Sequence, residues 1–401
     1  MAEKRILFIS WQGGMGHITR DLAIAHELHT QHPEWAIHWL AHPIAAMLLK
    51  DAGEQILPES RLSADYTSIA ETFYRNFQLN LIKYIIKIRK GYKQNAELFN
   101  QVIGQSTFDL VIGDEAYEVL WAICKGRIRH HPPFIMMHDF IGIDSVKKSL
   151  PELLFVSLRN RKWSASPNYP KVTQFFIGEP EDIPDTALGI GLPNRREWAD
   201  KHCKILGNIV RFNPGDFADR DKVKKRLGYG SEPLVVCALG GSKAGYEMLK
   251  LCGCAFPLVR NTIPNLKMVF ACGPSLDLKV LHVPEEIEVR GYVPELYEHF
   301  AASDLSIIVG GGTSTIELVA LNRPFIYFPL EAQFDQQINI AGRLERLGAG
   351  FKMRYFQTTP ESLAEQIVAH LGKKVRYPPV SIDGAKKAAR YISELIGSKE
   401  K

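Results

Sequence analysis

The sequence predicts an α/β protein of two domains, each built from parallel βαβ units, and three observations carry this prediction. At 401 residues the chain exceeds the roughly 100 to 200 residues of an ordinary single domain. Short apolar runs alternate with segments of helical periodicity in both halves. Between 178 and 214 Pro, Gly, Asp and Asn accumulate, so we place an N-terminal domain at 1–204 and a C-terminal domain at 205–384. A last helix over 385–401 either closes the second domain or crosses back to the first.

The N-terminal half opens on the pattern of a strand, a glycine turn and a helix. An apolar run at 6–9 is interrupted by the glycines of segment 13–16, and apolar residues then recur at helical spacing over 18–28. Strands that alternate with helices in this way form parallel sheets. The further strands expected in this half lie at 37–40, 110–112 and 134–137.

The C-terminal half repeats this architecture without repeating the sequence. Two of its expected strands are each followed by a glycine turn and a helix, which is again the βα pattern. The expected strands lie at 234–239, 267–271, 287–289, 305–309 and 325–328.

The composition is that of an ordinary globular protein, with 46% hydrophobic and 23% charged residues. The net charge of +5 is too small to demand nucleic acid, so we predict no such partner. The six cysteines are scattered without a Cys-x-x-Cys pair, which indicates reduced thiols in a cytoplasmic protein. No H-E-x-x-H pattern occurs, so we expect no metal site. The first apolar run is too short for a signal peptide, and no run of about 20 apolar residues predicts a membrane span.

Three glycine clusters, at 13–17, 240–242 and 310–315, each follow an expected strand and precede a helix. Glycine lets backbone N–H groups approach an anion, and the helix N-terminus adds positive charge, so a phosphate group suits such a turn. The alternative is a purely steric role in the turn. The first turn is not a dinucleotide fingerprint, because Thr19 replaces the third glycine and the second strand ends at His42 without an acid. A P-loop motif is absent as well.

Polar side chains accompany the third glycine cluster and the strand after it. Glu317 stands two residues after Thr315, where its carboxylate would accept the hydroxyls of a ribose; the alternative is a solvated helix acid. Asp335 and Gln336 follow the next strand, and a carboxylate beside an amide suits the hydroxyls of a sugar.

His17 stands at the mouth of the first glycine turn and is a candidate general base. It needs a partner carboxylate, for which Asp114, at the end of another strand of the same sheet, is the best placed residue. In the alternative, His17 packs the turn and Asp114 caps the helix that follows it. The spacing leaves both interpretations open.

Taken together, these residues resemble the GT-B glycosyltransferases, in which two Rossmann-like βαβ domains face a cleft. The turn GGMGHITR is similar to the N-terminal loop of the MurG-type family. The segment 290–350 resembles the donor-binding half of these enzymes, which carries the family 28 C-terminal domain, and of the natural-product glycosyltransferases. It has Ser314-Thr315-x-Glu317, then Arg323-Pro324, then Asp335-Gln336-x-x-Asn339 in the family's order.

The resemblance implies a role for each of these residues. His17 would deprotonate the acceptor hydroxyl with Asp114 orienting it, and the sugar would be transferred from a UDP-sugar with inversion, without a metal or a further cofactor. The backbone at Val293 would hold uracil, Glu317 the ribose, and Asp335 with Gln336 the sugar. The donor-binding residues implied are Gly14, Ser242, Val293, Gly311, Gly312, Thr313, Ser314, Glu317, Asp335 and Gln336.

Two departures separate the chain from other branches of this family. Natural-product members commonly have a histidine just before the third glycine turn, where Val309 stands here. Gly312 and Thr313 occupy the positions of the tryptophan and asparagine of the plant motif. The phosphate site therefore resembles the MurG type more closely.

The acceptor implied is a lipid or a small molecule. The segment Lys83 to Lys93 contains five basic residues, no acid and interleaved aromatic and apolar residues, which suits an anionic membrane surface. The alternative is a helix with its apolar side on the core and its lysines in water. Peripheral attachment to the inner face of the membrane is thus left open for a cytoplasmic protein.

Three functions are compatible with these observations. The first is an inverting glycosyltransferase that uses a UDP-sugar. The second is a hydrolase or epimerase of nucleotide sugars on the same fold. The third is a non-catalytic subunit that binds a nucleotide sugar or docks on a membrane.

Overall fold

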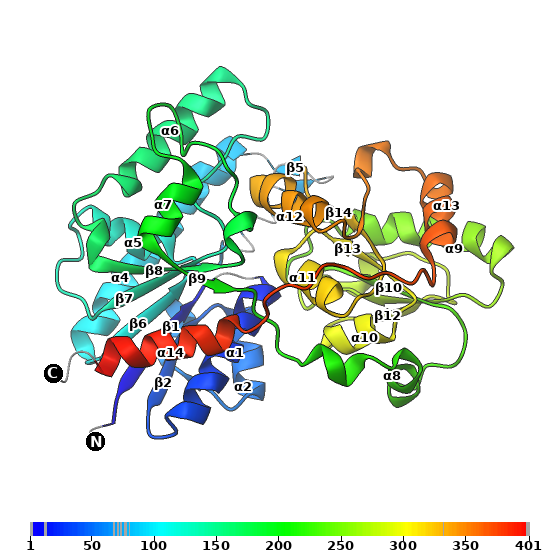
Figure 1. Ribbon diagram of the computed structural model, residues 1–401, viewed down its shortest axis with the longest axis horizontal. Helices are drawn as coiled ribbons and strands as arrows, with labels where there is room; N and C mark the ends of the chain where they lie inside the picture. The colour runs from blue at the N-terminus through cyan, green and yellow to red at the C-terminus, as the bar shows by residue number, and fades with distance from the viewer. Residues whose placement is uncertain are drawn as a thin grey trace. The chain divides into compact units, whose positions relative to one another are not determined.

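The protein divides into two compact units (Figure 1). The computed structural model describes residues 3–11, 14–66, 69, 72, 74–75, 78–79, 81–331 and 333–397, with the backbone alone for 74–75, 78–79, 81–86 and 170. The first unit comprises 1–73, 80–211 and 381–401, and the second comprises 74–79 and 212–380.

The first unit contains a parallel sheet of seven strands. Its strands are buried along most of their length, which explains why they are nearly continuous apolar runs. In spatial order they are β3 (Gln55–Ile56), β2 (Ala36–Ala41), β1 (Arg5–Ser10), β6 (Leu110–Asp114), β7 (Phe134–His138), β8 (Val172–Ile177) and β9 (Cys203–Gly207).

Helices of the first unit pack on this sheet and on one another. Leu7 and Ile9 of β1 share a core with Phe99, Val119 and Trp198, which come from three of the helices. The helices are α1 (Met15–Gln31), α2 (Pro43–Asp51), α4 (Leu81–Gln105), α5 (Tyr117–Cys124), α6 (Leu150–Ser164), α7 (Arg195–His202) and α14 (Gly384–Gly397). No helix in the described part of the chain is both long enough and apolar enough to cross a membrane.

The second unit contains a parallel sheet of six strands. In spatial order they are β12 (Glu288–Arg290), β11 (Lys267–Ala271), β10 (Leu234–Ala238), β13 (Leu305–Val309), β14 (Phe325–Phe328) and β15 (Phe351–Lys352). The helices are α8 (Arg220–Arg226), α9 (Glu247–Thr262), α10 (Leu296–Ala302), α11 (Gly312–Ala320), α12 (Ala341–Arg346) and α13 (Pro360–His370). A short antiparallel hairpin of β4 (Tyr74–Arg75) and β5 (Gln78–Leu79) is grouped with this unit.

Each sheet reverses its strand order at one place. In the first unit β1 lies between β2 and β6, and in the second unit β10 lies between β11 and β13. The connection that leaves β1 runs to β2, whereas the connection that leaves β6 runs to β7 on the other side, so the two separate at the carboxyl ends of these strands. The connections that leave β10 and β13 separate in the same way. Such a switch point is where parallel sheets bind ligands, at the carboxyl ends of the strands. The predicted α/β architecture is confirmed.

The predicted boundary at 204/205 is wrong, because it falls inside β9. That strand pairs with β8 as an edge of the first sheet, so the first unit continues to Arg211. The strand was not predicted because the segment around it is rich in Pro and Gly. The chain leaves the second unit after Val380, and α14 packs on α1 in the first unit, where Figure 1 shows the two helices side by side.

Candidate active site

His17 and Asp114 meet at the switch point of the first sheet. The strands β1 and β6 are adjacent and parallel, with Ile9 opposite Gly113, so their carboxyl ends lie side by side. Helix α1 begins directly after β1 and has His17 in its first turn, while Asp114 ends β6. His17 Nδ1 lies 3.0 Å from Asp114 Oδ2. The structure thus brings the two predicted catalytic residues together.

Arg20 is a third member of this group, and sequence analysis did not single it out. It stands one helical turn after His17, and its side chain is buried. Its Nε donates to Asp114 Oδ2 at 2.8 Å, and its Nη1 donates to Asp139 Oδ2 at 3.1 Å. One guanidinium therefore holds two carboxylates, the buried one of Asp114 and that of Asp139, whose side chain is 33% exposed.

The contacts of His17 define its tautomer. Nδ1 lies near Asp114 and also 2.8 Å from Arg20 Nη2, but a guanidinium can only donate, so these two contacts are alternatives for one ring nitrogen. With hydrogen on Nδ1, the ring donates to Asp114, and Arg20 remains satisfied by its carboxylate partners. We assign this tautomer, which leaves the lone pair on Nε2.

The carboxyl groups around His17 differ in protonation. Burial alone would raise the pKa of Asp114, but the charge of Arg20 and the interactions with His17 outweigh it and lower the pKa to about 2. Burial and the charge of Asp139 raise the pKa of Glu115 well above its usual range. Burial also opposes ionisation of Asp139, yet the hydrogen bond from Glu115 and the charge of Arg20 lower its pKa. Glu115 therefore carries the proton that it shares with an ionised Asp139.

Glu115 also approaches the free nitrogen of the histidine. Its Oε2 lies 4.0 Å from His17 Nε2. The residue has a φ of 49°, in the left-handed region that non-glycine residues rarely adopt. The carboxyl of Glu115 thus stands close to the atom that would act as the base, beyond hydrogen-bond distance.

Gly14 leaves space for the imidazole ring. A Cβ atom at this position would lie 2.9 Å from His17 Cδ2, closer than real Cβ contacts allow. The glycine is thus explained by the position of His17 within the first unit, and its predicted contact with the donor remains a prediction. Gly13 of the same turn lies outside the described residues.

In the second unit the two glycine turns are neighbours. They follow β10 and β13, which are adjacent and parallel, with Ala238 opposite Ile308. Gly311 is the N-cap of α11 and has no side chain to cap the helix. The first backbone N–H groups of a helix have no partner within it, so those of Gly312, Thr313 and Ser314 are available to an anion.

At three positions of these turns the backbone conformation does not require glycine. Gly240, Gly311 and Gly312 lack a left-handed φ, and a Cβ at any of them would meet no atom closer than 3.6 Å. At Gly310, in contrast, a Cβ would lie 3.2 Å from Pro329 Cα, so that glycine serves the fold. The fold does not force glycine at these three positions, which is compatible with the predicted approach of a ligand, and that contact remains a prediction.

The other predicted donor residues also lie in the second unit. Ser242 Oγ accepts from the N–H of Ala244 at 3.0 Å, in a loop that precedes α9. Val293 follows β12 and packs on the core, and Glu317 is buried on α11. No described group of three or more His, Cys, Asp or Glu side chains is arranged to hold a metal ion.

Asp335 and Gln336 begin a single π-helical segment, η6 (Asp335–Ile340). The side chain of Gln336 already has partners: Oε1 accepts from the N–H of Leu330 at 2.8 Å, and Nε2 donates to Gln333 Oε1 at 2.7 Å. Its amide therefore holds the loop after β14. The role of both residues in binding the sugar remains a prediction.

The basic segment Lys83 to Lys93 lies in α4, and from residue 87 onwards its side chains are described. Ile88 is buried in the core, whereas Lys87, Arg89 and Lys90 are exposed. This part of the segment fits a helix with its apolar side on the core and its basic side chains in water.

Comparison with known proteins places these features in a family. The model of the glycosyltransferase family 28 C-terminal domain matches residues 235–395. An uncharacterized glycosyltransferase of Methanosarcina acetivorans is 32% identical over 376 residues, which cover 89% of this chain and 85% of the relative. The UDP-N-acetylglucosamine–N-acetylmuramyl-(pentapeptide) pyrophosphoryl-undecaprenol N-acetylglucosamine transferase of Clostridioides difficile is 24% identical over 92% of this chain and 81% of its own length. The transferase of the same name from Carboxydothermus hydrogenoformans is 30% identical, but the match covers only 37% of this chain and 38% of the relative.

Solved structures share the fold at lower sequence identity. MurG of Acinetobacter baumannii has a TM-score of 0.53 at 17% identity and covers 98% of this chain and 99% of its own. The UDP-GlcNAc 2-epimerase of Methanocaldococcus jannaschii has a TM-score of 0.60 at 13% identity, with coverage of 98% and 99%. The architecture is thus that of the GT-B fold.

Proposed function

Because this chain belongs to the MurG-like glycosyltransferases of GT-B fold, we propose that it moves a hexosyl or N-acetylhexosaminyl group from a UDP-sugar to a hydroxyl of a lipid or small-molecule acceptor. The observation that carries this proposal is the 3.0 Å contact between His17 Nδ1 and Asp114 Oδ2. It leaves Nε2 as an acceptor for a proton, which activation of a hydroxyl requires.

In the proposed reaction His17 Nε2 takes the proton of the acceptor hydroxyl as its oxygen attacks the anomeric carbon. The bond between that carbon and the UDP oxygen breaks, and its electron pair leaves with the diphosphate. Attack from the face opposite UDP inverts the anomeric configuration. Asp114 stabilises the imidazolium that forms, as the acid of a catalytic triad does. Glu115 holds its own proton and so does not compete with His17 for the proton of the acceptor.

The donor would be held by the second unit. Backbone N–H groups at the start of α11 and the helix dipole suit the charge that develops on the leaving diphosphate, so the proposed reaction needs no metal. Activity in excess EDTA equal to that in its absence would support this point. In the same proposal Ser242 also binds the diphosphate, Glu317 the ribose, the backbone of Val293 the uracil, and Asp335 with Gln336 the sugar.

Replacement of His17 by alanine tests the proposal. We expect His17→Ala to lower kcat by about 10²- to 10⁴-fold, the range of general-base catalysis, with the affinity for UDP unchanged. The assay is UDP release from a panel of UDP-hexoses with diacylglycerol or polyprenyl phosphate as acceptor. His26→Ala is the matched control, since His26 is exposed on the same helix. Equal turnover by His17→Ala and the parent would show that His17 is not the base.

A hydrolase or epimerase of nucleotide sugars is the second candidate, since the epimerase described above has the same fold. The same assay without any acceptor separates the two. Free sugar or an epimerised nucleotide sugar formed at the full rate would favour this second function and contradict transfer.

For attachment to an anionic membrane, α6 provides a better surface than the basic segment of α4. Leu150, Leu154 and Leu158 recur every four residues and are 67%, 48% and 61% exposed, with Phe155 beside them at 40%. Exposed basic residues lie at both ends of this helix: Lys147 and Lys148 just before it, and Arg161 and Lys162 in its last turn. An apolar helix face with basic neighbours binds at the interface of anionic lipids. We propose that α6 holds the protein on the inner face of the membrane.

Vesicle sedimentation tests this attachment. Replacing Leu154 and Leu158 by serine should weaken binding to anionic vesicles by roughly 100-fold, because each leucine contributes about 1.5 kcal/mol or more of transfer free energy when buried. A variant with serine at exposed Leu62, which lies on another part of the first unit, is the control. Unchanged binding by the α6 variant would contradict the assignment.

A further inference from the structure

Glu115 lies beside the predicted base of the first unit. Its Oε2 is 4.0 Å from His17 Nε2, and the two side chains are 11% and 21% exposed. Both side chains therefore reach the surface of this unit at the switch point of its sheet, where a parallel sheet binds its ligand.

The position of Glu115 is fixed by its backbone and by a chain of polar contacts. Its N–H donates to the carbonyl of Met137 at 3.1 Å, and its carbonyl accepts from the N–H of Tyr117 at 2.7 Å. Arg20 Nη1 donates to Asp139 Oδ2 at 3.1 Å, and the carboxyl of Glu115 donates in turn to Asp139. The carboxyl thus has a defined place next to the base.

The backbone of Glu115 is in a conformation that glycine adopts more readily. Its φ of 49° lies in the left-handed region, where a side chain is sterically unfavourable. A glutamate kept in such a conformation points to a function of its side chain at this place.

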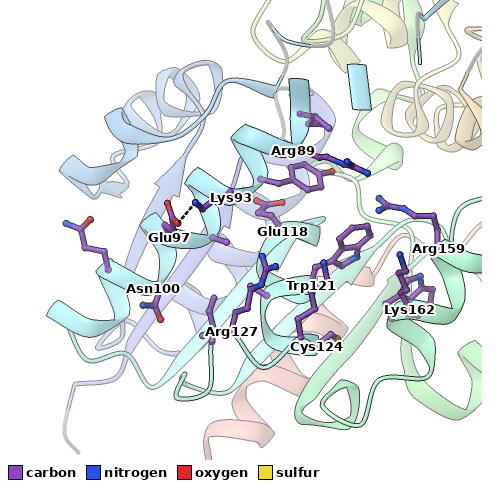
Figure 2. Close-up of a pocket in the computed structure, with 18 residues that line it drawn as sticks. Arg89, Lys93, Glu97, Asn100, Glu118, Trp121, Cys124, Arg127, Arg159 and Lys162 are labelled. Atoms are coloured by element: carbon purple, nitrogen blue, oxygen red, sulfur yellow. Dashed lines mark ion pairs between the residues drawn. The ribbon is translucent and has the colours of Figure 1, made fainter. Parts of the chain in front are cut away.

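Glu118, a buried acid three residues further along the chain, faces a different space. It lines a cavity of about 1100 Å³ between α4, α5 and α6, where Figure 2 shows its carboxyl. Neither His17 nor Glu115 is among the residues that line this cavity. Among the acids that the structure describes, Glu115 is therefore the one that approaches Nε2 of the base.

Two acceptor atoms meet a hydroxyl that enters this site. One is His17 Nε2, and the other is Glu115 Oε2, because the proton of Glu115 is directed to the ionised Asp139, a stronger acceptor than an alcohol oxygen. An alcohol has one hydrogen to donate, and Nε2 takes it, so a single hydroxyl cannot serve both atoms. Two hydroxyls on neighbouring carbons are spaced closely enough to reach both atoms, which are 4.0 Å apart.

We propose that Glu115 is a specificity-determining residue, which accepts a hydrogen bond from the hydroxyl next to the one that is glycosylated. The acceptor is then a compound with two neighbouring hydroxyls, as in a polyol. This role rests on the proposed function, since His17 takes the proton of the first hydroxyl. A compound without the second hydroxyl displaces water from Glu115 and returns no hydrogen bond, so the site discriminates against it.

Three short alcohols, 1,2-octanediol, 1-octanol and 2-octanol, test this role with the full-length protein. Each mono-alcohol lacks one of the two hydroxyls of the diol. With a UDP-sugar that the protein uses, we expect kcat/KM for the diol to exceed that for either mono-alcohol by at least about tenfold, the loss for one unsatisfied hydrogen bond. A preference of about twofold or less, which the two hydroxyls of the diol give by number alone, overturns the role of Glu115.

Glu115→Gly tests the assigned side chain. Glycine suits the left-handed backbone at this position, so the fold should tolerate the change. We expect the preference for the diol to fall to about twofold or less, while kcat/KM for the mono-alcohols stays within about threefold of that of the parent.

Asn322→Gly is the matched control, because Asn322 also has a left-handed φ, of 52°, and is exposed in the second unit. This variant should keep the preference of the parent. A preference kept by Glu115→Gly, or lost to the same extent in the control, overturns the assignment. An equal loss of turnover by Glu115→Gly with all three alcohols would make Glu115 a support of the base and overturns it as well.

Binding separates this role from the proposed function. In an NMR titration of the parent with UDP present, the diol should bind at least about tenfold more tightly than either mono-alcohol, and this titration decides if Glu115→Gly does not fold. Selective binding of the diol without transfer to any acceptor would leave the assignment of Glu115 and contradict the proposed function. Transfer to the three alcohols at equal rates would contradict the assignment of Glu115 alone.

Discussion

The two units share one topology and differ in what they present at its switch point. In each, the first strand lies between its successor and the strand that starts the second half of the sheet: β1 between β2 and β6, and β10 between β11 and β13. Both present a glycine turn and the start of a helix there, but the first unit adds charged side chains, whereas the turns of the second contain none. The topology thus determines where a ligand can bind, and the residues of the turns determine the chemistry of the site.

This difference predicts different sensitivities. Arg20 and Asp114 are buried charges, so each depends on the other for compensation, and Arg20 also pairs with the partly exposed Asp139. The turns 240–242 and 310–314 rely on backbone N–H groups and contain no ionisable side chain. The first site should respond to lost charge and to pH, and the second to added side-chain volume.

The largest effect is expected from Arg20→Gln. Removing the guanidinium leaves the buried carboxylate of Asp114 without its cationic partner, so the free energy of unfolding should fall by about 3 to 5 kcal/mol. Urea denaturation followed by circular dichroism measures this. Adding Asp114→Asn should recover part of the loss, because one uncompensated charge is then removed.

Arg61→Gln is the control for this variant, since Arg61 is exposed in the same unit and the change should cost less than about 0.5 kcal/mol. A loss for Arg20→Gln no larger than that of the control would show that the buried charges do not depend on Arg20.

Gly14→Ala should lower kcat without changing the affinity for UDP. The added Cβ would lie 2.9 Å from His17 Cδ2, so the imidazole must move, and a displacement near 1 Å can cost up to about 100-fold in rate. We expect kcat to fall by roughly 10- to 100-fold, with the affinity for UDP unchanged in a calorimetric titration. Weaker UDP binding with an unchanged kcat would instead assign Gly14 to the donor.

Gly312→Ala, in the second unit, should instead lower the affinity for UDP without changing the position of His17. Its Cβ would meet only Ile340 Cδ1, at 3.6 Å, so the fold tolerates it, and alanine in place of glycine raises helix stability by up to about 1 kcal/mol. UDP affinity should fall by roughly tenfold because the methyl group stands where the diphosphate approaches. Gly342→Ala on α12, also free of contacts, is the control. Unchanged UDP affinity would remove the start of α11 from the donor site.

The sequence predicted most of this arrangement because parallel strands are apolar runs with conspicuous glycine turns. The pairing of His17 with Asp114 follows from two strand ends in one sheet. Arg20 was missed, although its i, i+3 spacing from His17 was visible, because only the fold shows that the helix face carrying both residues meets Asp114. The strands β8 and β9 were missed as well, the first because it ends directly before the Pro- and Gly-rich segment and the second because it lies within it.

The sequence could not separate glycines that the fold requires from glycines with free space beside them, which are the ones predicted to bind the donor. Gly310 and Gly312 stand two residues apart in the same motif, yet only the first is pressed against a backbone atom, at Pro329. The cavity between three helices was equally invisible, because its residues come from segments that are distant along the chain.

The smallest effect is expected from Asp21, a buried acid beside Arg20 and Asp114. Burial first, and then the charge of Asp114, raise the pKa of Asp21 well above its usual value, against the opposing charge of Arg20. The folded protein therefore keeps a proton that the unfolded chain releases above about pH 4. By linkage, this residue lowers stability progressively as the pH rises from about 4 towards the folded pKa.

Asp21→Asn removes this pH dependence. The free energy of unfolding at pH 7 should rise by at least about 1 kcal/mol relative to the parent, and the gain should vanish below about pH 3, where the carboxyl is protonated in both states. Urea denaturation at the two pH values measures the difference, with Asp185→Asn, on an exposed residue of the same unit, as the control. An equal gain at both pH values would be a packing effect and would contradict the raised pKa. The gain of Gly312→Ala in the second unit should be the same at both pH values, because no ionisable group is changed there.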